Sequence, residues 1–106
     1  MFTTEAIALA AQRIAGASSS PAKVILIGSY ARCDATEDSD VDFLVLQKNF
    51  KDRSNKYRLL MSEIRKELSR VDLILMREED FEWKSLVGGT LPYWAKKKGP
   101  ILFDFN

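Results

Sequence analysis

The stretch GSYARCDATEDSDVD, residues 28–42, decides how this chain folds, because it joins two of its most apolar segments. VILI precedes it at 24–27 and FLVL follows it at 43–46. Both segments are short and apolar enough to be buried strands. The stretch itself carries the acidic residues Asp34, Glu37, Asp38, Asp40 and Asp42. A glycine–serine turn and a group of like charges therefore separate two predicted core strands.

Strand periodicity distinguishes two of these acids from the others. Asp40 and Asp42 are two residues apart at the start of segment 41–47, so their side chains are expected on the same face of a sheet. The remaining positions are apolar on both faces: Leu44 and Leu46 on one, Val41, Phe43 and Val45 on the other. Two carboxylates beside a buried face repel each other, and a divalent cation would neutralise them.

A third acid has a similar position in another predicted strand. Asp72 is the second residue of the apolar segment 71–76, VDLILM. If this strand lies beside segment 41–47, Asp72 joins Asp40 and Asp42. Three carboxylates supply the hard oxygen ligands that one or two Mg²⁺ ions prefer, and Mn²⁺ would also fit. Such an arrangement can clamp a phosphoryl or nucleotidyl group during transfer.

Gly28 and Ser29 supply a complementary feature, a predicted anion-binding turn. They directly follow strand 23–27, where a chain reversal can point backbone N–H groups at an anion. Glycine permits a close approach, the serine hydroxyl adds a donor, and Arg32 adds positive charge. Alone, a Gly-Ser pair is an ordinary turn and an Asp-rich loop an ordinary solvated loop. Together they indicate a site for a metal–nucleotide complex.

The rest of the chain alternates between helical and strand patterns. Helices are expected at 4–15, 54–69, 77–87 and 90–98, and strands at 23–27, 41–47, 71–76 and 101–105. Thr3 or Thr4 can cap the first helix, and Gly16 suits its end. Trp83, Tyr93 and Trp94 are expected to pack in the core or at its edge. The pattern predicts a single α/β domain, residues 1–106, with a sheet of three to four strands flanked by helices. It leaves the strand directions open.

The amino-acid composition excludes several classes of function. The formal net charge is +1, which gives no strong case for nucleic-acid or membrane binding, and a cytoplasmic protein is expected. The chain has no histidine, so Ser-His-Asp or Cys-His catalysis and histidine zinc sites are excluded. Cys33 is the only cysteine, and without a histidine to activate it, an inert thiol is expected.

Spacing also excludes three familiar motifs. An EF-hand starting at Asp38 would need glycine at position 43 and glutamate at position 49, where this chain has Phe43 and Asn49. No glycine-lysine-serine/threonine follows Gly28, as a P-loop requires. A dinucleotide-binding fingerprint needs three spaced glycines, and this turn has one.

The combined pattern resembles a known family. Gly28-Ser29, ten intervening residues and Asp40-Val41-Asp42 resemble the signature of the DNA polymerase beta-like nucleotidyltransferase superfamily. The sequence GSYAR…SDVDFLVL, with Asp72 as the third acid, is similar to the corresponding sequence of the minimal nucleotidyltransferases in this superfamily. The resemblance covers about residues 20 to 105.

The resemblance implies a mixed β-sheet with flanking helices and transfer of a nucleoside monophosphate from a magnesium–nucleoside triphosphate, such as ATP, to a hydroxyl group. It implies that Gly28 and Ser29 hold the triphosphate and that Asp40 and Asp42 bind metal. Asp72 would bind one metal and help to activate the acceptor. Many such minimal proteins resemble antitoxins that add AMP to a tyrosine of a HEPN-domain RNase.

Two further expectations concern the partner and the turn. Larger members carry additional domains that hold the acceptor, so the acceptor here is expected to be a partner protein, or a second subunit completes the site in a homo- or hetero-oligomer. Alternatives are a contact-only antitoxin and one chain of a two-chain enzyme acting on a small molecule or nucleic acid.

The family usually has glycine where this chain has Cys33; if that position needs φ > 0, cysteine is strained there.

Overall fold

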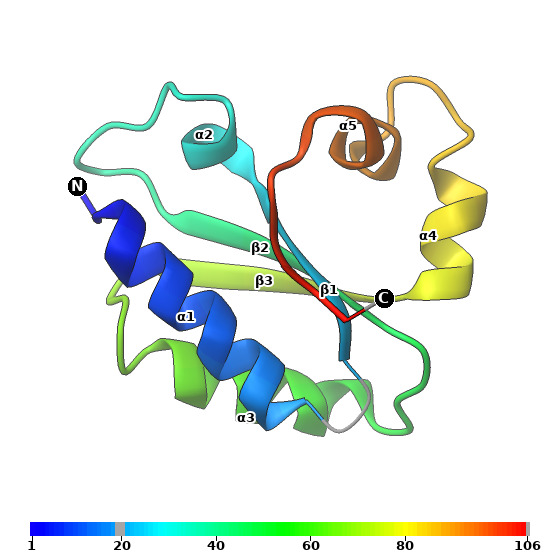
Figure 1. Cartoon of the computed structure of the whole chain (residues 1–106), viewed down its shortest axis with the longest axis horizontal. Coiled ribbons are helices and arrows are strands. Elements are labelled where there is room, and N and C mark those ends of the chain that lie inside the picture. Colours follow the sequence, from blue (N-terminus) through cyan, green and yellow to red (C-terminus); the bar gives the residue numbers. More distant parts are fainter. Residues whose placement is uncertain (19–20, 106) are drawn as a thin grey trace.

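Four strands form one sheet in the order β3-β2-β1-β4 (Figure 1). The computed structural model describes residues 1–18 and 21–105. In chain order the elements are α1 (Thr4–Ala17), β1 (Pro21–Ile27), α2 (Gly28–Ala31), β2 (Val41–Gln47), α3 (Arg53–Ile64), β3 (Val71–Arg77), α4 (Glu78–Lys84), α5 (Leu91–Lys98) and β4 (Ile101–Asp104). β1 runs antiparallel to β2 and β4, whereas β2 and β3 are parallel. The predicted small mixed sheet is confirmed, and the strand directions are now assigned.

The ends of the first long helices differ from the sequence prediction. The Thr3 side chain accepts a hydrogen bond from the Ala6 N–H and caps α1, which then continues through Gly16 to Ala17. α3 was predicted to extend to residue 69 but ends at Ile64. There the Lys66 N–H bonds to the Glu63 carbonyl, a tighter turn than the α-helical one. The apolar periodicity continued past this end because Leu68 is also buried.

Both C-terminal helices lie where the sequence predicts them, and α4 is shorter than predicted. α4 occupies the first part of the predicted helix 77–87, and α5 begins after Thr90, whose hydroxyl accepts from the Tyr93 N–H. Trp94 packs partly buried against the core, as expected. The expectation for Trp83 is wrong, since 72% of it is exposed. α4 buries Phe81, and a residue two positions later on a helix faces away from that side.

The sheet is covered on both faces, and each cover forms its own apolar cluster. α1 and α3 lie on one face of the sheet, and α4 and α5 lie on the other (Figure 1). The first cluster contains Ile7, Ala10, Ala11, Ile14, Val24, Leu26, Val41, Phe43, Val45, Phe50, Leu60, Met61, Ile64, Leu68, Leu73 and Leu75. The second contains Ile25, Ile27, Leu44, Leu46, Phe81 and Ala95. The predicted alternation along β2 is therefore confirmed, and it places the even-numbered positions of that strand on the α4/α5 side.

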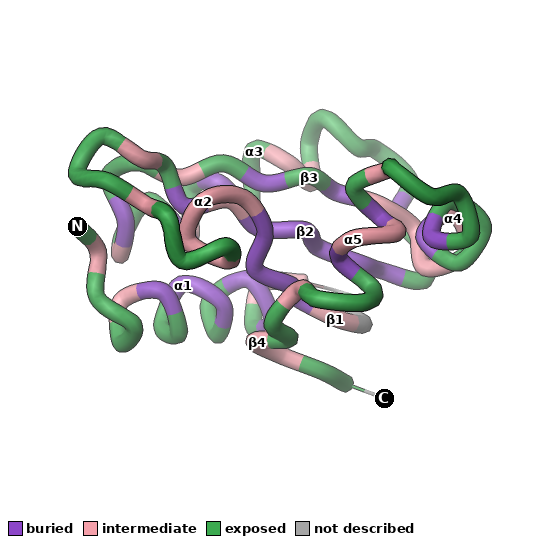
Figure 2. Tube along the Cα trace, turned by 90° about the horizontal axis from the view of Figure 1, so that it is seen from above, coloured by how far each residue is buried: buried purple, intermediate pink, exposed green. Residues whose placement is uncertain are grey.

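Burial is concentrated in the strands and on the inner side of α1, while the connection between α2 and β2 is mostly exposed (Figure 2). In the described parts of the chain, no helix is long and apolar enough to cross a membrane. The exposed connection leads directly into the start of β2, where Asp42 lies.

Candidate functional site

The turn that follows β1 brings the backbone very close to an acidic side chain. Gly28 has a φ of 74° and opens the four-residue helix α2. A Cβ atom added to Gly28 would lie 2.6 Å from Oδ2 of Asp42. The antiparallel register explains this approach, because Ile27 at the end of β1 pairs with Asp42 at the start of β2. Only glycine combines that φ with this contact without strain.

The second acid of the site comes from the parallel neighbour of β2. Asp42 pairs in register with Asp72 of β3, so the two carboxylates lie on adjacent strands at the same end of the sheet. A cavity of about 320 Å³ opens there. Its lining consists of Ile27, Gly28, Arg32, Asp42, Phe43, Asp72, Leu73, Ile74 and Leu91. Four of the six residues predicted for the site thus border one cavity.

The charges around Asp42 act against its ionisation. Partial burial raises the pKa of its carboxyl above the ordinary value, and the negative charges of Asp40 and Asp72 raise it further. The guanidinium of Arg32 acts in the opposite direction and is the weakest of these influences. The site therefore has an excess of negative charge that one arginine does not balance, and a bound cation would relieve it.

The remaining predicted residues lie beside the cavity. Asp40 is exposed and precedes the first residue of β2, within electrostatic reach of Asp42. Ser29 is in the first turn of α2 and is not part of the cavity lining described above. Arg32 does line the cavity, and its Nε lies 3.4 Å from Oδ2 of Asp34, an exposed pair with little energetic weight.

The chemistry of these donors fits a hard divalent cation. Carboxylate oxygens are its preferred ligands, and the mutual repulsion at Asp42 is what a cation would remove. Nevertheless, within residues 1–18 and 21–105 no three acidic, histidine or cysteine side chains converge tightly enough to hold a metal ion. The three carboxylates therefore do not converge on one point: Asp42 and Asp72 border the cavity, and Asp40 is exposed ahead of the strand.

The bond at Asp72 identifies a residue that sequence reasoning did not assign to the site. The hydroxyl of Tyr57, on α3, donates to Oδ1 of Asp72 at 2.5 Å. Tyr57 lies within the helix predicted at 54–69, and no motif in the sequence marked it as a site residue. The charge of Asp72 raises the pKa of the Tyr57 phenol, chiefly through this hydrogen bond, so the phenol stays a donor at neutral pH.

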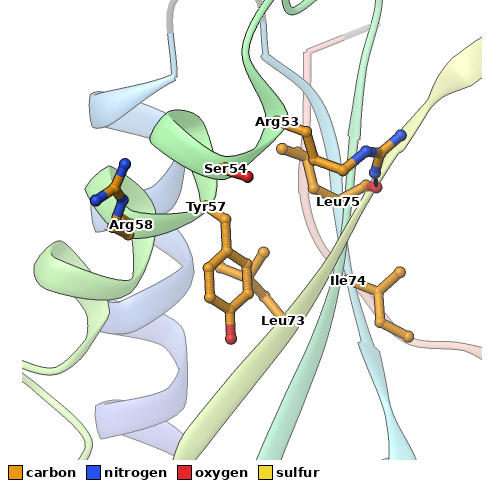
Figure 3. A pocket seen from close by; sticks show the side chains of 7 residues that line it. All are labelled: Arg53, Ser54, Tyr57, Arg58, Leu73, Ile74 and Leu75. Carbon is orange, nitrogen blue, oxygen red and sulfur yellow. Dashed lines mark hydrogen bonds between the residues drawn. The ribbon is translucent and has the colours of Figure 1, made fainter.

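Tyr57 also borders a second cavity, of about 470 Å³, on the outer side of β3. Figure 3 shows its lining, which consists of Arg53, Ser54, Tyr57, Arg58, Leu73, Ile74 and Leu75. Leu73 and Ile74 line both cavities, so the two lie next to each other along β3. In Figure 3 the Tyr57 ring lies between α3 and β3, and the Arg53 guanidinium donates to the Leu75 carbonyl oxygen.

Cys33 adopts a positive φ, the backbone conformation in which cysteine is expected to be strained. Its φ is 64°, the only positive value at a non-glycine residue among the described positions. A left-handed conformation is costly for a residue with a Cβ atom. The side chain is exposed, and the Cys33 N–H lies 3.4 Å from the Tyr30 carbonyl. The strain thus falls in the loop that leads from Arg32 towards the acids.

Comparison with protein families decides the assignment. The sequence profile described as "Nucleotidyltransferase domain" matches residues 10–97, which include the turn, all three acids and Tyr57. The chain belongs to the nucleotidyltransferase family. The cavity between Gly28 and the paired aspartates is therefore the candidate active site of this nucleotidyltransferase domain.

A solved structure has the same fold. A candidate nucleotidyltransferase from Sulfolobus solfataricus superposes on the nucleotidyltransferase domain with a TM-score of 0.59 and 24% sequence identity. The match covers 93% of this chain and 86% of the other. At this identity the likeness concerns the fold. A search of curated proteins found no significant match.

Proposed function

We propose that this nucleotidyltransferase domain moves a nucleoside monophosphate, AMP from ATP, onto a hydroxyl group of a partner protein. The observation that supports the proposal most directly is the cavity that Gly28, Arg32, Asp42 and Asp72 share. An anion-binding turn and carboxylates for a cation border the same space. This is the combination that a metal–triphosphate substrate requires.

The positively and the negatively charged residues of the site have different roles in binding the metal–nucleotide complex. The Gly28 turn and the Arg32 guanidinium hold the triphosphate, the first through backbone N–H groups and the second through its charge. Asp42 and Asp72, with Asp40 beside them, would hold Mg²⁺, and Ser29 adds a hydroxyl donor near the turn. When bound, Mg²⁺ neutralises charge on the reacting phosphates and orients them. Asp72 also faces the acceptor hydroxyl and takes up its proton as the new phosphoester bond forms and pyrophosphate leaves.

The proposal of a protein acceptor rests on the family resemblance. The resemblance to minimal nucleotidyltransferase antitoxins points to a HEPN-domain RNase as the partner, whose tyrosine would receive AMP. That pairing makes the chain the antitoxin of the two.

The experiment is transfer of α-labelled ATP to a co-expressed HEPN protein in the presence of Mg²⁺. The double variant Asp40→Asn, Asp42→Asn should lose the label on the partner. The matched control is Glu37→Gln, Asp38→Asn, which neutralises two exposed acids of the preceding loop and should keep it. Mass spectrometry of the partner should find one added AMP per labelled residue. Full labelling by the Asp40→Asn, Asp42→Asn protein would contradict the assigned site.

The contact-only antitoxin makes a different prediction for the same double variant. It would still form the complex and still protect cells from the RNase. A variant that binds the partner but no longer protects cells would support catalysis, and one that binds and protects would support neutralisation by contact. Measuring complex formation and protection side by side therefore separates the two functions.

A further inference from the structure

The Asp72 carboxylate lies in an exposed position that the sheet alone does not fix. Asp72 is the second residue of β3, which is the outer strand of the described sheet and pairs with β2 on one side. Its side chain is exposed, and such a carboxylate ordinarily samples several rotamers. A metal ligand has to present its oxygen in one orientation, so an uncontrolled carboxylate here would bind a cation weakly.

Two hydrogen bonds remove this freedom, and both reach the same oxygen. The Tyr57 hydroxyl donates to Oδ1 of Asp72 at 2.5 Å, and the backbone N–H of Leu73 donates to that oxygen at 2.8 Å. The bond from Leu73 is local, between neighbouring residues. The bond from Tyr57 comes from another element, fifteen positions away. With Oδ1 occupied twice, Oδ2 is the oxygen left for a ligand.

Tyr57 itself is well placed to act as a fixed support. It precedes Leu60, Met61 and Ile64 by three, four and seven residues, so it shares their face of α3. Those three side chains are buried in the first apolar cluster, and Tyr57 packs partly buried against it. The ring lies between α3 and the outer edge of β3 (Figure 3). The hydroxyl position is thus set by the core of the domain, and the carboxylate is set by the hydroxyl.

We propose that Tyr57 is a positioning residue, which orients Asp72 towards the cation that accompanies the nucleotide. Groups that hydrogen-bond a metal ligand without touching the metal typically change its affinity or the activity by roughly 10–100-fold. This inference rests on the proposed function, because only a cation-binding Asp72 gives Tyr57 this task. It adds a residue of α3 to a site otherwise built from the ends of β1, β2 and β3.

The test is Mn²⁺ binding, measured by calorimetry with a non-hydrolysable ATP analogue present, so that no turnover is needed. Tyr57→Phe keeps the ring and its packing and removes only the hydroxyl. We expect it to weaken Mn²⁺ binding by about tenfold while the affinity for the analogue without metal stays the same. Tyr93→Phe is the matched control, because the Tyr93 hydroxyl accepts from Lys97 on α5, outside the cavity lining. It should bind Mn²⁺ like the wild type.

A double-variant cycle separates positioning from a general structural effect. If Tyr57 acts through Asp72, adding Tyr57→Phe to Asp72→Asn should weaken Mn²⁺ binding no further. A general loss of stability would weaken binding in both backgrounds, so the cycle stays informative if Tyr57→Phe lowers the melting temperature. Wild-type affinity in Tyr57→Phe, or losses that add, would overturn the inference and leave the proposed function standing. A wild-type domain that binds neither Mn²⁺ nor the analogue would overturn both.

Discussion

The two faces of the sheet differ in how much apolar surface their helices bury. The face covered by α1 and α3 holds a continuous apolar cluster, whereas the α4/α5 face holds a small one and leaves Trp83 and Leu86 largely exposed. The candidate site lies at the end of the thinly covered face, because Asp42 shares it with Leu44 and Leu46. The densely packed side supplies the stability that a strained and charged site on the other side uses.

The largest expected effect tests the densely packed side. Leu60→Ala removes a fully buried side chain from α3 and should lower the free energy of unfolding by roughly 2–5 kcal/mol. Leu59→Ala, one residue earlier on the same helix, is the control: Leu59 is 47% exposed and should cost well under about 1 kcal/mol. Urea denaturation measures both. Equal losses would show that burial of Leu60 in the cluster under α3 does not supply this stability.

Asp42→Asn tests the charged end of the other face and should separate activity from stability. Loss of an indirect metal partner alone costs roughly 10–100-fold, so loss of this carboxylate should lower nucleotidyl transfer by at least about 100-fold. Without metal and nucleotide, the variant should melt at a higher temperature than the wild type at neutral pH. The reason is that the pKa of Asp42 is raised, which means that its charged form destabilises the folded state.

The pH dependence follows from that sign. The penalty is absent below the ordinary pKa of 3.8, where the carboxyl is protonated in both states. It grows as the pH rises from 3.8 to the raised folded-state pKa, because only the unfolded state is ionised in that interval, and it is complete above the folded-state pKa. The melting temperatures of wild type and Asp42→Asn should therefore converge as the pH falls towards that range. A constant difference across the whole pH range would contradict the electrostatic explanation.

Gly28→Ala tests the close approach between the turn and Asp42. A left-handed φ costs a residue with a Cβ atom about 1–2 kcal/mol, and here the new atom would also displace the Asp42 carboxylate. Both stability and nucleotide binding should fall. Gly16→Ala is the matched control, since its Cβ meets nothing within 4 Å, and in a helix it should stabilise by roughly 0.5–1 kcal/mol. Thermal melts of the pair should move in opposite directions.

The smallest expected effect concerns the strained loop. Cys33→Gly relieves a φ of 64°, but glycine also gives the unfolded chain more freedom, so the net gain should be only about 0.5 kcal/mol. Urea denaturation and labelled-ATP transfer together measure it. An increase in transfer beyond the wild type would show that the cysteine conformation restrains the site. An unchanged rate would confine its effect to stability.

The sequence predicted most of this architecture because alternation within strands and helical spacing report burial directly. The two faces of β2 followed from that reasoning, whereas the neighbouring positions of Asp42 and Asp72 were predicted only on the condition that the two strands pair. The helix end at Ile64 did not, since Leu68 continues the apolar pattern after the helix has ended. Tyr57 was also missed, because its bond to Asp72 depends on how α3 lies against β3, which no local pattern records. The site residues themselves stay a prediction until the variants are measured.

The antiparallel pairing of β1 with β2 has a practical consequence for the loop between them. Gly28 and Asp42 are held together across the sheet, by the register of Ile27 with Asp42, and the exposed loop merely connects the two strands. The separation of ten residues in the motif is then a property of loop length and is not what sets the distance. A few residues inserted near Glu37 should leave the turn and the acid in contact, which makes this loop a suitable place for a spectroscopic label or an affinity tag.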